Sequence, residues 1–195
     1  MTGAEAQGAQ PGLRLNLGCG TKRLPGYVNV DKFGDPDVKL DLEVFPWPWS
    51  TSSVSEIQLV HVLEHLGHDP NVYLRIVQEM YRVCMPGAHV KIIVPHHRHE
   101  FFFSDPTHVR AITPLGLSLF SKRANRAWVA SGASNSPLGL YLDVDFEIER
   151  TDWKPSTDWF RLHPSPDVDV EHLLREAAIY NNLIEEIQIL LRVVK

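Results

Sequence analysis

Residues Leu13 to Gly20 read Leu-Arg-Leu-Asn-Leu-Gly-Cys-Gly, an alternating apolar run that ends on two glycines. A second apolar run, Tyr27 to Val30, follows within ten residues and ends on Asp31. A strand that stops at Gly-x-Gly exposes backbone N–H groups and lets a ligand approach where a side chain would collide. An acid at the tip of the neighbouring strand accepts hydrogen bonds from ribose hydroxyls. Together the two runs predict a site for a nucleoside-containing cofactor.

The length of 195 residues fits one domain with a single core. We expect a disordered tail at residues 1–12, which is rich in Ala, Gly and Gln, and one domain over residues 13–195. The net charge of −5 and the lack of a dense Lys/Arg stripe argue against a nucleic-acid binder that works by bulk attraction to phosphates.

Targeting signals are missing from the sequence. No apolar stretch approaches the ~20 residues of a membrane span, and the first residues lack the pattern of a signal peptide. The two cysteines, Cys19 and Cys84, do not suggest a disulfide framework. We therefore expect a cytoplasmic protein.

Strand-like and helix-like signals alternate along the chain, which predicts an α/β fold. Pro86-Gly87 is expected to end a helix, and residues 128–140 are expected to form a loop. The expected helices are Asn71–Cys84, Pro114–Arg126 and Val170–Tyr180. The expected strands are Leu13–Leu17, Val28–Asp31, Val38–Leu42, Ile57–Val62, His89–Val94, Leu142–Glu149 and Ile184–Val194.

The first crossover is unusually short. Only six residues, Thr21 to Gly26, separate Gly20 from Tyr27, whereas a parallel crossover normally takes about a dozen residues or more. The first crossover helix is therefore expected to be missing or reduced to a turn. Without a long helix dipole the site is poorly suited to a pyrophosphate.

Three features bear on which cofactor binds. Arg23 stands where the dinucleotide fingerprint needs a third small residue, and Asp31 follows the glycines sooner than in nicotinamide enzymes. Asp41-Leu42, at the end of the third expected strand, places a carboxylate beside an apolar surface. This pair suits an adenine ring, whose exocyclic amine donates to the acid.

Several stretches, taken in order, resemble the class I S-adenosylmethionine-dependent methyltransferases, in particular small bacterial members similar to methyltransferase type 11. The resemblance spans nearly the whole chain from Leu13. It implies S-adenosylmethionine as the cofactor and a Rossmann-like three-layer sandwich, whose seven-stranded, mostly parallel sheet has only its last strand antiparallel. The stretches are Leu15-Asn16-Leu17-Gly18-Cys19-Gly20, Val28-Asn29-Val30-Asp31, Asp41-Leu42, His61-Val62-Leu63-Glu64-His65-Leu66, Arg82-Val83-Cys84-Met85-Pro86-Gly87-Ala88 and Leu191-Arg192-Val193-Val194-Lys195.

The same resemblance assigns residues to parts of the cofactor. Gly18 and Gly20 are expected to face its methionine and ribose portion, and Asp31 to hold the ribose hydroxyls. Asp41 and Leu42 are expected to hold the adenine.

Three further residues belong to this expected cofactor site. His61 is expected near the methionine carboxylate and the transferring methyl, and Cys19 lies between the two glycines. Asn16 stands where the family usually has an acid; it accepts a hydrogen bond but does not pair as a charge with the cofactor ammonium.

The motif His61-x-x-Glu64-His65 invites a metal hypothesis, because two imidazoles and a carboxylate lie close together. His96 and His97 follow the fifth expected strand, at the sheet edge where ligands collect. Zinc hydrolysis, metal-assisted methyl transfer and a purely structural role all remain open. A zinc hydrolase of this pattern needs its residues on a long helix, whereas here the motif ends a strand.

The segment from Pro95 to Arg110 interleaves aromatic, imidazole and charged side chains. His108 is the candidate general base, because the pKa of an imidazole lies near working pH. Asp105 is expected to orient that imidazole, and Arg110 to hold an anionic group of the substrate. The competing interpretation is a loop folded onto the sheet edge, in which Asp105-Pro106 caps a turn.

These patterns favour a methyltransferase that acts on a small-molecule or saccharide-like acceptor, without nucleic acid and without a membrane span. Two alternatives stay open: an inactive cofactor-binding protein of the same fold, and a metal hydrolase that uses His61, Glu64 and His65. The sequence decides neither the acceptor atom nor the oligomeric state.

Overall fold

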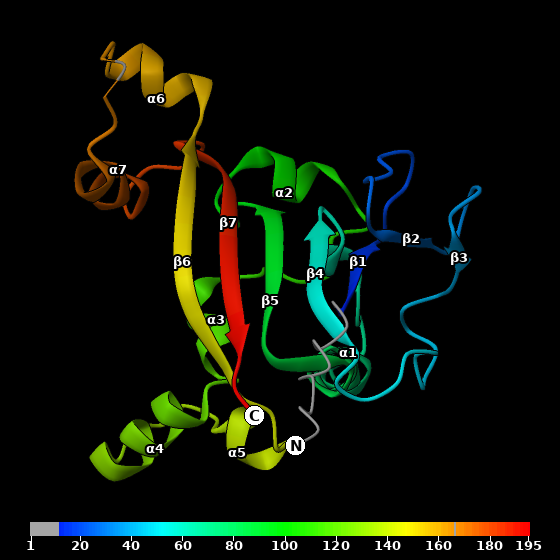
Figure 1. Cartoon of the computed structure of the whole chain (residues 1–195). Coiled ribbons are helices and arrows are strands. Elements are labelled where there is room, and N and C mark those ends of the chain that lie inside the picture. The colour runs from blue at the N-terminus through cyan, green and yellow to red at the C-terminus, as the bar shows by residue number, and fades with distance from the viewer. Residues whose placement is uncertain (1–11, 166) are drawn as a thin grey trace, which may run out of the picture.

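A seven-stranded sheet organises the protein in the computed structural model, which describes residues 12–165 and 167–195 (Figure 1). Of the expected tail at residues 1–12, all but Gly12 lies outside the described residues. The strand order is β3-β2-β1-β4-β5-β7-β6. The strands are β1 (Leu13–Leu17), β2 (Val28–Asp31), β3 (Val38–Lys39), β4 (Val54–Val60), β5 (Cys84–Pro95), β6 (Phe146–Pro155) and β7 (Ile184–Val193).

The direction of the strands agrees with the expected fold class. β7 runs antiparallel to both of its neighbours, β5 and β6, and the pairs from β3 to β5 are parallel. The reversed arrow of β7 is visible between β5 and β6 (Figure 1). The predicted seven-stranded α/β sheet with one antiparallel strand is confirmed.

The helices gather in the part of the chain after β4. Between β1 and β4 the described residues contain no helix, so the expected loss of the first crossover helix is confirmed. None of the described helices is both long and apolar enough to span a membrane. The helices are η1 (Leu63–His65), α1 (Pro70–Val83), α2 (Glu100–Ser104), α3 (Pro114–Ser118), α4 (Lys122–Ser131), α5 (Leu138–Tyr141), α6 (Thr157–Leu162) and α7 (Val170–Ala177).

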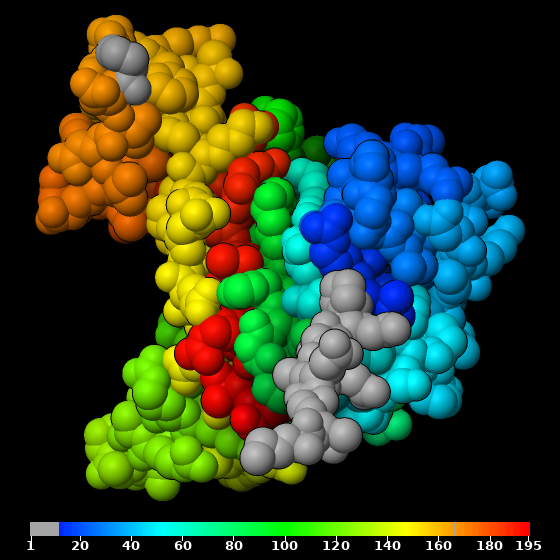
Figure 2. All heavy atoms as spheres, in the orientation of Figure 1, coloured from blue at the N-terminus to red at the C-terminus, as the bar shows by residue number. Residues whose placement is uncertain are grey.

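The two faces of the sheet differ: helices cover one, and the other carries polar side chains. Ile57, Leu59 and Ile92 point to one face, which packs in the main core with Ile76 of α1 and Leu117 of α3. On the other face polar side chains alternate with them in register, as the period of a strand requires. That face carries Gln58, Lys91 and Gln188, all partly exposed. Atoms of β4, β5, β6 and β7 are visible on that face in the space-filling view (Figure 2). Among the described residues, therefore, no second helical layer of the expected three-layer sandwich covers this part of the sheet.

Ser121 divides the single helix expected at Pro114–Arg126 into α3 and α4. The Oγ atom of Ser121 accepts a hydrogen bond from the backbone N–H of Ala124 and caps α4. α4 then continues to Ser131, and α5 follows at Leu138–Tyr141, so much of the loop expected at residues 128–140 is helical.

Strand boundaries also differ from expectation. β5 begins at Cys84 instead of His89, because residues 85–88 form an irregularity in the pairing with β4 that accommodates Pro86-Gly87. β6 begins at Phe146 instead of Leu142, after the turn that follows α5. β3 is shorter than expected, β4 runs from Val54 to Val60, and α2 and α6 were not anticipated.

Candidate functional site

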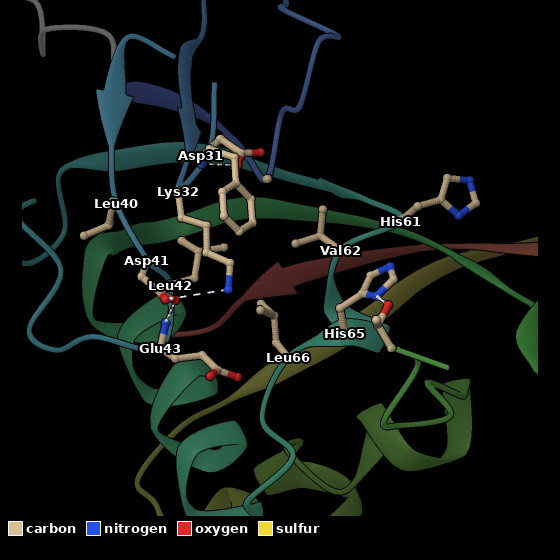
Figure 3. Close-up of a pocket in the computed structure, with 13 residues that line it drawn as sticks. Asp31, Lys32, Leu40, Asp41, Leu42, Glu43, His61, Val62, His65 and Leu66 are labelled. Atoms are coloured by element: carbon tan, nitrogen blue, oxygen red, sulfur yellow. Dashed lines mark hydrogen bonds and ion pairs between the residues drawn. The ribbon is translucent and has the colours of Figure 1, made fainter. Parts of the chain in front are cut away.

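Two adjoining cavities lie where the parallel strands end, and they share His61 and His65. The strand-tip cavity has a volume of about 390 Å³ (Figure 3). The histidine cavity has a volume of about 380 Å³. Gly18, Asp31, Lys32, Phe33, Leu40, Asp41, Leu42, Glu43, Val62, Leu66 and Thr107 complete the lining of the first, and Glu64, Pro95, Phe101, Asp105, His108, Glu185 and Glu186 that of the second.

The two glycines after β1 are required for different reasons. Gly18 has φ +66°, and a Cβ added to it would lie 2.5 Å from a methyl of Val62. Gly20 has φ +51° with open space around it, and its N–H donates to Asp31 Oδ2 at 2.8 Å. Gly18 therefore permits η1 to approach β1 closely, and Gly20 turns its amide toward the carboxylate.

Asp31 is held rigidly at the end of β2. Its Oδ2 accepts from Gly20, and its Oδ1 accepts from the backbone N–H of Phe33 at 2.8 Å. A carboxylate offers about four acceptor positions, so both oxygens keep capacity for a ligand. Asp31 points into the strand-tip cavity from its β2 side (Figure 3).

Asp41 and Leu42 stand at another side of the same cavity (Figure 3). Asp41 Oδ1 accepts from the backbone N–H of Glu43 at 3.0 Å, and Asp41 Oδ2 lies 3.7 Å from Lys32 Nζ. Leu42 is buried, with 6% of its surface exposed. The strand-tip cavity thus offers a carboxylate beside an apolar wall, as the sequence predicted for this pair.

A partly buried ion pair in α1, between Glu79 and Arg82, fixes the loop that carries Leu42. The indole N–H of Trp47 donates to the carbonyl of Leu42 at 3.1 Å, and the backbone N–H of Trp47 donates to Glu79 Oε2 at 2.7 Å. The Arg82 guanidinium bonds the same carboxylate at 2.7 Å and donates to the carbonyls of Trp47 and Trp49. Hydrogen bonds from Arg82 hold the pKa of Glu79 below its ordinary value.

Phe33 is a lining residue that the sequence reasoning missed. Its side chain is 71% exposed, although large aromatic side chains normally find cover. Together with Val62 and Leu66 it gives the cavity flat apolar walls. The sequence signal that could have identified Phe33 as a lining residue is its position two residues after Asp31, the acid at the strand tip.

His61 lies between the two cavities, directly after β4, with φ +54°. Its Nδ1 is 3.6 Å from Glu64 Oε1, and its Nε2 is 3.0 Å from Glu186 Oε2. The carboxylates of Glu64 and, to a lesser degree, Glu186 raise the pKa of His61 above its ordinary value.

His108 lines the histidine cavity, but its expected partner is not the one that orients it. Its Nδ1 lies 2.8 Å from the carbonyl oxygen of Phe102, and because a carbonyl only accepts, Nδ1 carries the proton and Nε2 keeps a lone pair. Asp105 Oδ2 is 4.0 Å from His108 Nε2, beyond hydrogen-bond range. The orienting role expected of Asp105 is thus filled by a backbone carbonyl.

Asp105 instead orients a different imidazole, that of His65, through the side chain of Thr107. Asp105 Oδ1 accepts from the backbone N–H and from the hydroxyl of Thr107, at 2.8 and 2.6 Å. Since the Thr107 hydroxyl gives its proton to Asp105, its oxygen accepts from His65 Nδ1, 2.8 Å away. His65 therefore also keeps its lone pair on Nε2.

Four of the expected cofactor-binding and catalytic residues line neither cavity: Asn16, Cys19, Gly20 and Arg110. Arg110 donates to the carbonyl of Gly67 at 2.7 Å and stacks 4.2 Å from the centre of the Tyr73 ring. The Asn16 amide donates to Lys22 and Asn29 and so supports the short crossover. Cys19 is buried, and its N–H donates to the carbonyl of Val30.

His96 and His97 are not brought to the His61 cluster. They line a separate cavity with Trp153 and Ala177. Burial lowers the pKa of His96 to about 4 and also lowers that of His97. The fold therefore does not bring His96 and His97 together with Glu64 and His65, as the metal hypothesis required.

No protein-family model and no curated protein matches this chain. Solved structures do match it. A SAM-dependent methyltransferase from Archaeoglobus fulgidus is 16% identical, with a TM-score of 0.59 over 94% of this chain and 86% of that chain. A SAM-dependent methyltransferase from Methanosarcina mazei is 14% identical, with a TM-score of 0.53 over 94% and 93%.

A third similar structure contains ligands. It is the 1,6-didemethyltoxoflavin-N1-methyltransferase of Burkholderia thailandensis, with bound 1,6-didemethyltoxoflavin and S-adenosylhomocysteine. It is 12% identical, with a TM-score of 0.53 over 95% of this chain and 72% of that chain. At these identities the similarity establishes the fold of class I S-adenosylmethionine-dependent methyltransferases for this chain.

Proposed function

We propose that this protein is an S-adenosylmethionine-dependent methyltransferase and that the strand-tip cavity holds the adenosyl group. The observation that carries the proposal is that Asp31 and the Asp41-Leu42 pair line one cavity at the strand tips. The fold shared with methyltransferases of known structure supports it. Fold alone does not determine activity, so the proposal depends on these side chains.

In the proposed complex, different residues of the strand-tip cavity contact the ribose, the adenine and the methionine portion of the cofactor. Asp31 accepts hydrogen bonds from the ribose hydroxyls through those carboxylate lone pairs that are not used by the N–H groups of Gly20 and Phe33. The adenine packs on Leu42 and Phe33 and donates its exocyclic amine to Asp41. The methionine portion then extends past Gly18 toward His61, which lies on the opposite side of the cavity from Asp41 (Figure 3).

The methyl acceptor enters the histidine cavity, because His61 and His65 belong to both cavities. Methyl transfer from a sulfonium mainly requires that the nucleophile be aligned with the methyl and that water be excluded. We propose a small-molecule or saccharide-like acceptor with a hydroxyl nucleophile. Nε2 of His108 carries a lone pair suited to receive the proton of that hydroxyl.

Two measurements test the proposal. S-adenosylhomocysteine is expected to raise the melting temperature of the protein, whereas adenosine diphosphate is not. Incubation with methyl-labelled S-adenosylmethionine and a panel of hydroxylated small molecules and sugars is expected to label an acceptor. A stabilising shift without any labelling favours the inactive cofactor-binding alternative, and no shift contradicts the proposed function.

A further inference from the structure

Glu64 is the most unusual polar side chain in the described part of the protein. Only 1% of its surface is exposed, and neither carboxylate oxygen has a hydrogen-bond partner. An unpaired buried carboxylate is strongly unfavourable, so such groups are normally paired with a cation or bound to a metal. The nearest cationic candidate is His61, at 3.6 Å and 43% exposed. Apart from this longer contact, no cationic side chain among the described residues lies within ion-pair distance of Glu64.

The fold brings two imidazoles to this carboxylate. The backbone N–H groups of Val109 and Arg110 both donate to the Glu64 carbonyl, at 2.9 and 3.2 Å, which ties the following loop to η1. One ligand atom each from Glu64, His65 and His108 lie within 4.8 Å of one another. The rings of His65 and His108 have centroids 4.6 Å apart.

Both imidazoles are prepared as ligands. His108 directs its Nδ1 proton to the carbonyl of Phe102, and His65 directs its own to Thr107, which in turn bonds Asp105. Metal-binding histidines are typically oriented in this way, with the second ring nitrogen donating to a carbonyl or a polar group. Each ring is left with one lone pair, on Nε2.

We propose that Glu64, His65 and His108 bind one divalent transition-metal ion. Two imidazoles and one carboxylate are a ligand set of catalytic zinc and of non-haem iron, with open positions for a further ligand. Mg²⁺ is a poor fit, because it prefers oxygen ligands. A zinc ion with bonds of about 2.0–2.2 Å needs its ligand atoms somewhat closer than 4.8 Å, so metal binding requires the three side chains to move toward one another.

A second group with the same residue types provides a comparison. His163, His172 and Glu176 also meet the distance criterion. There the carboxylate is already paired, 3.5 Å from His163 Nε2 and 3.3 Å from His172 Nε2, and the side chains are partly exposed. Glu64 also has one imidazole at a similar distance, His61 at 3.6 Å, so burial is what distinguishes its group: the Glu64 side chain is 1% exposed, whereas that of Glu176 is 29% exposed.

The proposed metal deepens the proposed function and rests on it for its chemical role. An acceptor hydroxyl that occupies an open metal position becomes more acidic and loses its proton to water. Its oxygen then forms a bond to the methyl carbon while the carbon–sulfur bond breaks, and the sulfur keeps the electron pair as S-adenosylhomocysteine leaves. In this mechanism His108 is a metal ligand, and this role replaces that of the proton acceptor proposed for it above, because the same Nε2 lone pair cannot serve both.

The test is a titration of tag-free, metal-stripped protein with Co²⁺, followed by visible absorbance and calorimetry. The protein carries His172→Ala to disable the exposed cluster, in a side chain that is 40% exposed. We expect one Co²⁺ per chain with visible absorption bands, and displacement by Zn²⁺. Glu64→Gln and His108→Ala, added to the same protein, are each expected to weaken Co²⁺ binding about tenfold or more.

The control is His97→Ala, an imidazole outside both cavities, which is expected to leave Co²⁺ binding unchanged. Thermal melts identify any variant that fails to fold. The absence of Co²⁺ binding to the folded His172→Ala protein, or equal binding in folded Glu64→Gln, overturns the metal site. S-adenosylhomocysteine titrations of the same samples separate the two claims: cofactor binding without metal binding rejects only the metal, and the reverse rejects only the cofactor.

Discussion

The strand-tip cavity and the histidine cavity adjoin each other but satisfy their polar groups in different ways. In the first, Asp31 accepts hydrogen bonds from the backbone N–H groups of Gly20 and Phe33, and Asp41 accepts one from that of Glu43. In the second, the buried Glu64 carboxylate accepts no hydrogen bond from the described residues, and His108 and His65 each keep a lone pair on Nε2. The first cavity thus has its carboxylates hydrogen-bonded, and the second contains the buried carboxylate to which we assign the metal.

From this difference we infer that the strand-tip cavity mainly binds the cofactor and that the histidine cavity supports the chemical step. A preformed cavity of satisfied groups binds a ligand mainly by shape and by its remaining acceptor positions. An unsatisfied buried carboxylate raises the free energy of the folded protein until a ligand pairs with it. We therefore expect substitutions near the strand tips to change stability and cofactor affinity, and substitutions in the histidine cavity to change metal binding and turnover.

The largest effect is expected from Gly18→Ala, which breaks the strand-tip cavity. The substitution places a Cβ 2.5 Å from Val62 and in a positive-φ conformation, so we expect the free energy of unfolding to fall by about 3 kcal/mol. Urea denaturation measures this loss. Gly20→Ala is the matched control: its φ is also positive but the space is open, so about 1 kcal/mol is expected. Equal losses in the two variants contradict the role given to the Val62 contact.

A somewhat smaller effect is expected from Glu79→Gln, which loosens the loop that supports Leu42. The variant loses charge-assisted hydrogen bonds from Arg82 and Trp47, at a cost of about 2–3 kcal/mol near pH 7. Because the folded-state pKa of Glu79 is lowered, its contribution is present above the pKa of the unfolded chain and is lost as the pH falls below it. Urea denaturation from pH 7 to pH 3 is expected to show the two proteins converging, and a constant difference argues against the ion pair.

The smallest effect sharpens the comparison at the adenine wall. Phe33→Ala removes a flat, exposed ring from the strand-tip cavity, and we expect S-adenosylhomocysteine affinity to fall about fivefold, a loss near 1 kcal/mol. Phe103→Ala is the control, because Phe103 is 73% exposed and does not line that cavity. Calorimetry that finds the same affinity in both variants removes Phe33 from the site.

The positions at the strand tips were predictable from sequence because they depend on local geometry. Gly18, Asp31 and Asp41 directly follow short apolar runs, and the ends of parallel strands meet at one edge of a sheet. The structure places all three at one cavity. Their roles toward a cofactor stay predictions.

The expected site residues that line neither cavity are positioned by side-chain direction or by contacts with other segments. Asn16 alternates with Leu15 and Leu17 in β1, so its amide lies on the opposite face from the core and meets the short crossover. The hydrogen bond from Arg110 to the carbonyl of Gly67 and its stacking on Tyr73 hold the guanidinium outside both cavities. No local pattern reveals these tertiary contacts.

The buried state of Glu64 was equally invisible in the sequence. The motif showed a carboxylate between two histidines, but not that the loop with His108 pairs with η1 through the Glu64 carbonyl. Nor did it show that Phe102, and not Asp105, orients His108. Val109 is far from Glu64 in the sequence, and Phe102, only six residues before His108, is selected by the direction of the imidazole ring, which no residue pattern reveals.

The most direct test of the account is calorimetric titration of S-adenosylhomocysteine into the wild-type protein and two aspartate variants. Asp31→Ala removes the carboxylate assigned to the ribose, and Asp35→Ala removes an exposed carboxylate of the same loop that does not line the cavity. We predict binding by the wild type and by Asp35→Ala, with affinity about tenfold or more lower in Asp31→Ala. Absence of wild-type binding, or equal affinity in all three proteins, contradicts an adenosyl site at the strand tips.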